Sequence, residues 1–177
     1  MKTHVLKKEI LLPVSLPVAW KFFSNPYNLK LITPPEMNFE ILTKNLPDKI
    51  YSGLMVEYTV TPLFGIKMKW VTEIKEVNEP GSFADNQHSG PYAKWYHTHR
   101  FTQTDEGTLM QDEVHYALPL SFLGSMAHTF FVRKKLQHIF DYRTKIIRGT
   151  FQKELYHEHP YSYRYVLFYG ICGVVHP

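Results

Sequence analysis

The sequence predicts an α+β domain in which a strongly curved antiparallel sheet wraps around one long C-terminal helix. Between about residues 37 and 118, runs of alternating apolar and polar residues are separated by turn signals rich in Gly, Pro and Asp, which is typical of antiparallel strands and hairpins. From about 121 to 151, apolar residues recur at helical spacing without an internal proline. Strands followed by one long helix favour a two-layer design with a cavity between sheet and helix.

The composition supports one globular domain. The chain has 177 residues, of which 44% are apolar and 20% charged, so it can bury a substantial core. The net charge of +4 is too mild to indicate a nucleic-acid partner. The single cysteine, Cys172, excludes an internal disulfide framework and favours a reducing compartment, so we expect a cytoplasmic protein. No apolar run approaches the ~20 residues of a transmembrane helix.

The N-terminal part predicts one strand and two short helices. Residues 3–12 have the pattern of a strand rather than of a signal peptide, since no small-residue cleavage site follows. Ser15 is a good N-cap for a first helix, and Asn25-Pro26 ends that helix. A second short helix is expected at 27–32.

The rest of the chain predicts the sheet and the long helix. The expected strands are at about 37–44, 53–62, 66–77, 82–87, 93–104 and 108–118. The expected helix covers about 121–151, and its apolar residues are Phe122, Met126, Phe130, Leu136, Phe140, Ile147 and Phe151. It also carries a basic set against one acid, Asp141: Arg133, Lys134, Lys135, Arg143, Lys145 and Arg148. We interpret this set as a solvated face; the alternative is a patch for an anionic membrane surface, ribosomal RNA or an acidic partner.

The most informative motif lies in the strand expected at 93–104. Trp95, His97, His99 and Phe101 share one parity, and the residues between them are mostly polar. Because alternate side chains of a strand point to opposite faces, two histidines lie on the same face as two large aromatics. The pattern indicates an apolar chamber with a few polar groups inside. By the same parity rule, the predicted lining residues are Tyr58, Met68, Trp70, Trp95, His97, His99, Phe101, Met110, Asp112 and Tyr116 from the strands, with Met126, Phe130, Leu136 and Phe140 from the helix.

A hairpin at Gly107 would bring Asp112 beside the two histidines, and three interpretations remain open. The first is a buried hydrogen-bonded network in which Asp112 orients a histidine. The second is acid–base catalysis by His97 or His99 with Asp112 as partner. The third is a metal site with His97, His99 and Asp112 as ligands. A His-x-His spacing alone is a weak metal signal, so we predict neither a metal nor a cofactor.

Several other polar residues near this motif have open roles. Asp85 and Gln87 precede the Gly90-Pro91 turn, and we expect them to stabilise that loop rather than line the chamber. Tyr58 and Tyr116 could offer hydroxyl groups to a ligand or serve as core aromatics. The sequence contains neither a Gly-rich phosphate loop nor a G-x-S-x-G nucleophile turn.

The order of elements and a joint set of motifs resemble the SRPBCC superfamily of START-like and birch-pollen-allergen-like helix-grip domains. The closest similarity is to a bacterial ligand-binding subgroup grouped with polyketide cyclases and coenzyme-Q-binding proteins. The matching residues are Trp70, Phe83-x-Asp85-x-Gln87-x-x-Gly90-Pro91-Tyr92, Trp95-x-His97-x-His99-x-Phe101, Gly107-Thr108, Asp112-x-Val114-x-Tyr116-x-x-Pro119 and Phe140-Asp141-Tyr142-Arg143. The resemblance covers about residues 1–152 and implies a helix-grip fold with a ligand cavity. It leaves function open, because the superfamily includes carriers and enzymes.

We therefore expect residues 1–152 to form a START-like ligand-binding domain and 153–177 to form an aromatic-rich C-terminal tail. The expected function is carrying or sensing a hydrophobic small molecule such as a lipid, quinone or polyketide. The alternative is a cyclase, dehydratase or hydrolase that uses His97, His99 and Asp112; we favour a binding protein over an enzyme. A third hypothesis is a module that docks on a ribosome, membrane or protein through the basic face and the tail.

Overall fold

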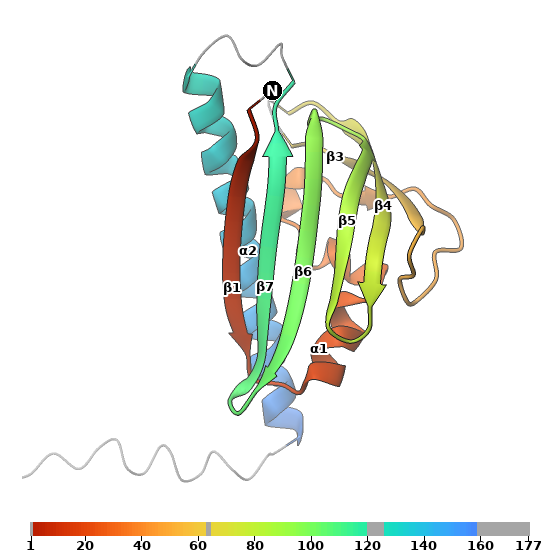
Figure 1. The fold of residues 1–177 in the computed structure, drawn as a ribbon, viewed down its shortest axis with the longest axis vertical. Helices are drawn as coiled ribbons and strands as arrows, with labels where there is room; N and C mark the ends of the chain where they lie inside the picture. Colours follow the sequence, from red (N-terminus) through yellow and green to blue (C-terminus); the bar gives the residue numbers. More distant parts are fainter. Residues whose placement is uncertain (1, 63–64, 120–125, 159–177) are drawn as a thin grey trace, which may run out of the picture.

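The computed structural model describes residues 2–62, 65–119 and 126–158, and over these residues the chain has the predicted α+β architecture (Figure 1). The short helical elements are α1 (Leu16–Phe23), η1 (Pro26–Lys30) and η2 (Pro35–Met37), and the long helix is α2 (Met126–Glu158). The strands are β1 (His4–Leu12), β2 (Glu40–Ile41), β3 (Met55–Val60), β4 (Met68–Asn78), β5 (Ser82–Ser89), β6 (Lys94–Thr104) and β7 (Gly107–Ala117).

The strands form one antiparallel sheet of seven strands in the order β1-β7-β6-β5-β4-β3-β2. The first strand of the chain therefore pairs with the last, and the other neighbours are consecutive in sequence. Two register shifts interrupt the pairing of β4 with β5, one between Val71 and Thr72 and one between Lys75 and Asn78. Such bulges bend a strand and increase its twist, which gives the sheet its concave face.

The long helix packs across the concave face of the sheet, and Figure 1 shows it in blue behind β1 and β7. Its buried stripe consists of Val132, Leu136, Phe140, Ile147 and Phe151. The prediction that Phe130 faces inward is wrong: its side chain is 60% exposed, and Lys134 lies over its ring. Phe130 precedes Val132 by two residues, or about 200° around the helix, which puts it on the opposite face.

The N-terminal helical segment differs from the prediction in its details. Ser15 occupies the N-cap position of α1, but its side chain makes no capping hydrogen bond. The side chain of Gln103 accepts a hydrogen bond from the Leu16 amide instead, at 2.8 Å. The second short helix is a 3₁₀ turn whose N-cap, Asn25, accepts a hydrogen bond from the Tyr27 amide at 3.0 Å.

Aromatic rings join α1 to the sheet and to α2. The Trp20 ring makes edge contacts with Phe83 and Phe101, at centroid distances of 6.0 and 5.9 Å. Phe23 lies 5.2 Å from Phe101 and 6.2 Å from Phe151. These contacts hold α1 against one end of the sheet, where the functional site lies.

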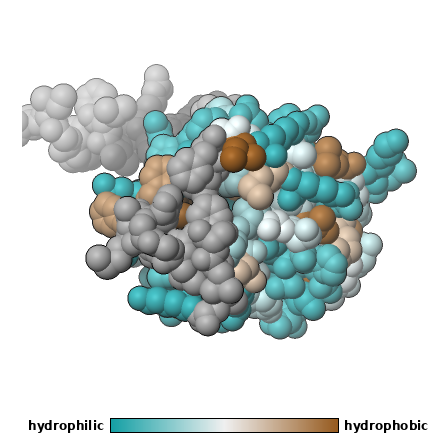
Figure 2. All heavy atoms as spheres, turned by 90° about the horizontal axis from the view of Figure 1, so that it is seen from above, coloured by the Kyte–Doolittle hydropathy of each residue, from teal (hydrophilic) through white to brown (hydrophobic). Residues whose placement is uncertain are grey.

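The domain boundary predicted at residue 152 falls inside α2, which continues to Glu158. The remainder of the predicted tail, from 159 onward, lies outside the described residues, so the hypothesis that the tail docks on a partner stays a prediction. On the face seen in Figure 2, the described surface is mainly hydrophilic and its hydrophobic residues are scattered. Within the described part of the chain, no helix is both long and apolar enough to cross a membrane.

Candidate functional site

A cavity of about 160 Å³ lies between the sheet and the α1–η1 segment. Its sheet side is formed by Val56, Tyr58, Trp70, Thr72, Ile74, Phe83, Asp85, Trp95, His97 and His99. Its helical side is formed by Phe22, Phe23, Asn25, Pro26, Asn28, Leu29 and Ile32, and Ile50 and Arg143 complete the wall. The prediction that the cavity lies between the sheet and the long helix is wrong in its position: α1 and η1 cover the cavity, and of the α2 side chains that the structure describes only Arg143 lines it. The cavity is apolar with a polar cluster in its wall, which is the usual composition of a small-molecule site.

Tryptophan and tyrosine rings form much of the apolar wall. The Trp70 ring lies 5.3 Å from Trp95, 5.6 Å from Tyr92 and 5.9 Å from Tyr58. The indole Nε1 of Trp70 is buried without a hydrogen-bond partner among the described residues. An unpaired buried donor is costly, and the Trp70 side chain also lines the cavity.

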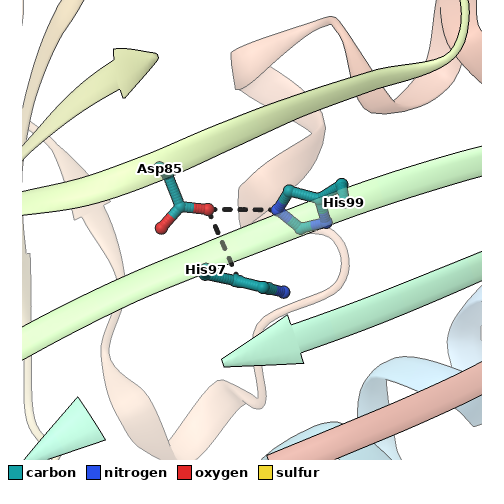
Figure 3. Close-up of side chains that lie close together, drawn as sticks. All are labelled: Asp85, His97 and His99. Carbon is teal, nitrogen blue, oxygen red and sulfur yellow. Dashed lines mark hydrogen bonds and ion pairs between the residues drawn. The ribbon is translucent and has the colours of Figure 1, made fainter. Parts of the chain in front are cut away.

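The polar cluster is built by three adjacent strands. Alternation along β6 puts His97 and His99 on the concave face, where their side chains are 4% and 2% exposed. The sheet register sets Asp85 of β5 opposite His97 and Asp112 of β7 opposite His99. The two carboxylates therefore flank the histidines from both neighbouring strands, and Figure 3 shows Asp85 directed at the two rings.

The four side chains form a closed ring of contacts. Asp112 Oδ1 lies 2.6 Å from His99 Nδ1 and 3.1 Å from His97 Nε2. Asp85 Oδ2 lies 3.0 Å from His99 Nε2 and 3.4 Å from His97 Nδ1, while Asp85 Oδ1 accepts a hydrogen bond from Trp95 Nε1 at 3.3 Å. An ionised carboxylate can only accept hydrogen bonds, so when Asp85 and Asp112 are both ionised, both nitrogens of His99 donate and the ring is an imidazolium.

The charges within the cluster stabilise this protonation state. Burial would raise the pKa of Asp112, but the Arg143 guanidinium and then the two histidines hold that pKa well below its usual range. Burial would likewise lower the pKa of His99, but the Asp112 carboxylate and hydrogen bonds to both aspartates raise it. Burial and the neighbouring charge of His99 lower the pKa of His97. The pKa values of the two histidines are thus shifted in opposite directions, that of His99 upward and that of His97 downward.

Arg143 and Asp85 are the charged lining residues that the sequence interpretation missed, and it did not predict the α1–η1 side of the cavity. We expected Arg143 on a solvated face, but it lines the cavity, and its Nε is buried without a hydrogen-bond partner in the described residues. We expected a loop role for Asp85, but this carboxylate belongs to the polar cluster. Burial would raise its pKa, but His97 and the hydrogen bond from His99 outweigh that effect and lower the pKa. Gln87 does stabilise the loop, through hydrogen bonds with the Tyr92 backbone.

Of the lining residues predicted from the sequence, those that line the cavity are Tyr58, Trp70, Trp95, His97 and His99. Phe101, Met110, Asp112, Tyr116, Leu136 and Phe140 are buried in the core around it instead. Met68 is half-buried outside the lining, Phe130 is exposed, and the side chain of Met126 is not among those described. Tyr116 packs between His4 and Tyr92, whereas the Tyr58 hydroxyl is hydrogen-bonded to Thr72 at 3.0 Å. Burial raises the pKa of Tyr58, which therefore stays neutral.

The candidate metal ligands also differ from the sequence prediction. Among the described residues, the group whose ligand atoms converge is Asp85, His97 and His99, all within 4.8 Å of one another. Asp112, the third ligand of the sequence hypothesis, instead contacts the opposite ring nitrogens of the two histidines.

Neither the known protein families nor the curated proteins include a sequence match to this chain. Solved structures do match. Protein Ms6760 from Mycobacterium smegmatis is 20% identical, with a TM-score of 0.62 over 85% of this chain and 92% of that one. A START superfamily protein from M. smegmatis is 15% identical, with a TM-score of 0.61 over 85% and 98%. The chain has a START-like helix-grip fold. The protein Ara h 8.0201 is also similar, at 17% identity and a TM-score of 0.54 over 86% and 99%.

Proposed function

We propose that the protein binds a hydrophobic small molecule in the cavity between β3–β6 and the α1–η1 segment. The observation that carries this proposal is an apolar cavity lined by two residues whose buried polar donors have no partner in the described chain. Trp70 and Arg143 both line this cavity, and the indole N–H of Trp70 and the Nε–H of Arg143 lack acceptors in the described chain. A ligand with an oxygen at one end of an apolar body would satisfy them and bury its apolar part.

The volume of the cavity limits the size of the ligand that it can hold. An engineered apolar cavity of about 150 Å³ in another protein binds benzene. The cavity here, at about 160 Å³, has room for one ring, so an aromatic or quinone ring fits better than a folded acyl chain. A longer lipid or polyketide would have to extend outside it or displace the α1–η1 segment. We propose a carrier or sensor of such a molecule, acting in the cytoplasm.

Filling the cavity tests this proposal. Leu29 lines the cavity, whereas the nearby Leu31 is 58% exposed, so Leu29→Trp and Leu31→Trp form a matched pair. Titration of chelator-treated protein with neutral single-ring quinones and aromatics, followed by tryptophan fluorescence, should show saturable binding to wild type and Leu31→Trp. Leu29→Trp should lose it. Equal binding by both variants, or none by the wild type, would contradict the proposal.

A second candidate function is acid–base catalysis in the same cavity, and what favours it is the contact of two cavity-lining histidines with Asp112, together with the opposite shifts of their pKa values. His97 would accept a proton from a bound molecule, and Asp112 would hold the ring in place through Nε2. The reaction class would be that of a cyclase, dehydratase or hydrolase. Conversion of any bound ring compound by the wild type but not by His97→Gln supports this candidate; equal conversion by both removes it.

A further inference from the structure

The polar cluster has the geometry of a metal site as well as that of a hydrogen-bonded network. Asp85 Oδ2 lies 3.4 Å from His97 Nδ1 and 3.0 Å from His99 Nε2, and each of the three residues offers a ligand atom within 4.8 Å of the other two. Ligand atoms that bind zinc tetrahedrally, at about 2.0–2.2 Å, are about 3.4 Å apart. We propose that Asp85, His97 and His99 bind a divalent transition-metal ion such as Zn²⁺ at the wall of the cavity.

The second ring nitrogens of both histidines are already held in the orientation that metal binding needs. Asp112 Oδ1 contacts His97 Nε2 and His99 Nδ1, which leaves His97 Nδ1 and His99 Nε2 directed at Asp85. Metal-binding histidines almost always donate their other N–H to a carboxylate or carbonyl, which fixes the tautomer. Here one carboxylate does this for both rings.

The carboxylate ligand is oriented in the same way. Trp95 Nε1 donates to Asp85 Oδ1 at 3.3 Å, which leaves Oδ2 as the atom that faces the two rings. Each of the three proposed ligands thus has one polar atom held by a neighbouring side chain. Its other polar atom faces the proposed metal position. When the proton on His97 lies on Nε2, its Nδ1 and Asp85 Oδ2 are two acceptors facing each other, an arrangement that a cation between them stabilises.

The charges around the cluster favour a cation. In the metal-free cluster, protonated His99 and Arg143 balance the negative charges of Asp85 and Asp112. Once His99 loses its proton, one negative charge is left over. A bound metal ion would replace the proton that His99 shares with Asp85 and release it to the solvent.

Three protein ligands leave at least one coordination position open. The three ligands line the cavity, so a water molecule or an oxygen of a bound ring compound could occupy that position. Two histidines and one carboxylate with open positions are a ligand set of catalytic zinc and of mononuclear iron sites. Sequence spacing alone had pointed to Asp112 as the third ligand; the geometry assigns that role to Asp85 and makes Asp112 a positioning residue.

Metal titration of the intact chain tests the proposal. The purified protein is dialysed against a chelator and titrated with ZnCl₂ by calorimetry, and with CoCl₂ by visible absorption. We expect one Zn²⁺ per chain. Asp85→Asn should abolish the cobalt spectrum, and Asp112→Asn should weaken Zn²⁺ binding by about 10–100-fold. His115→Ala is the matched control, since His115 pairs with Glu113 on the outer face of β7, and it should bind Zn²⁺ like the wild type.

A second measurement needs no variant and therefore no assumption about folding. In nitrogen NMR of the wild type, Zn²⁺ should shift His97 Nδ1 and His99 Nε2 strongly and the opposite nitrogens weakly. Absence of Zn²⁺ binding to the wild type, unchanged binding to folded Asp85→Asn, or shifts confined to surface histidines would each overturn the proposal. Because the ligand titration above uses metal-free protein, either proposal can fail while the other stands.

Discussion

Replacing Asp112 by Asn should destabilise the protein more than any other single change that keeps the shape of the cluster. The Asp112 side chain is 7% exposed and accepts hydrogen bonds from His97 and His99 at 3.1 and 2.6 Å. In the asparagine variant one carbonyl oxygen remains, the carboxylate charge is lost, and an N–H group competes for the same space. The positive charges on His99 and Arg143 then lose one of their two carboxylate counter-ions, and Asp85 is the one that remains.

Breaking one partner of a buried ion pair costs about 3–5 kcal/mol. For a chain of 177 residues, each kcal/mol corresponds to about 2–4 °C in Tm, so a 3 kcal/mol loss predicts a decrease of about 6–12 °C. Urea unfolding followed by tryptophan fluorescence measures the free energy, and calorimetry measures Tm. Chelator-treated protein is used, so that metal binding does not contribute.

The matched control is Glu113→Gln on the same strand. The Glu113 side chain is 25% exposed and pairs with Lys7 and His115 on the convex face, so its replacement should cost less than about 1 kcal/mol. A free energy of unfolding for Asp112→Asn within 1 kcal/mol of wild type, or equal to that of Glu113→Gln, would refute the argument that the cluster is held by its buried carboxylate.

Three further outcomes are expected. Phe151→Ala should lower the free energy of unfolding by about 3–5 kcal/mol, because Phe151 is fully buried, whereas Phe130→Ala should change it by less than about 1 kcal/mol; similar costs would contradict the helix orientation. Gly107→Ala should cost at least about 1–3 kcal/mol in urea unfolding, because Gly107 has φ of +132° and a Cβ there would overlap a backbone carbonyl of β1; a neutral effect would contradict this close approach. A hydrogen bond from His115 is the main cause that lowers the pKa of Glu113 to about 2, so its small stabilisation should be complete above pH 4.5 and be lost as the pH falls toward 2. Comparing wild type with Glu113→Gln across that range measures it, and parallel pH profiles would contradict it.

The sequence predicted the elements that depend on local periodicity. Alternation placed His97 and His99 on one face of β6, and the hairpin at Gly107 brought Asp112 next to them, as the register confirms. The same rule would have found Asp85, which shares parity with the buried Phe83 on a strand that was predicted correctly. The loop interpretation was wrong because Asp85 lies inside β5, before the Gly90-Pro91 turn.

Helical spacing likewise indicates that Arg143 faces the interior, although the sequence interpretation did not use it. Arg143 follows Phe140 by three residues and precedes Ile147 by four, so it lies on the buried stripe of α2, and its charge alone led to a surface assignment. The position of the cavity could not be read from spacing, because it depends on how α1 and η1 pack over β3–β6. That packing rests on contacts between distant residues, such as Phe23 with Phe101 and Phe151.

The indole N–H signals of the three tryptophans test the ligand proposal most directly. Trp70 and Trp95 line the cavity, whereas Trp20 packs outside it against Phe83 and Phe101. In a nitrogen–proton correlation spectrum of metal-free protein titrated with a neutral ring compound, the Trp70 and Trp95 signals should shift in a saturable way and the Trp20 signal should stay in place. Shifts of all three together, or of Trp20 alone, or no shift with any ring compound, would contradict the binding of a hydrophobic molecule in this cavity.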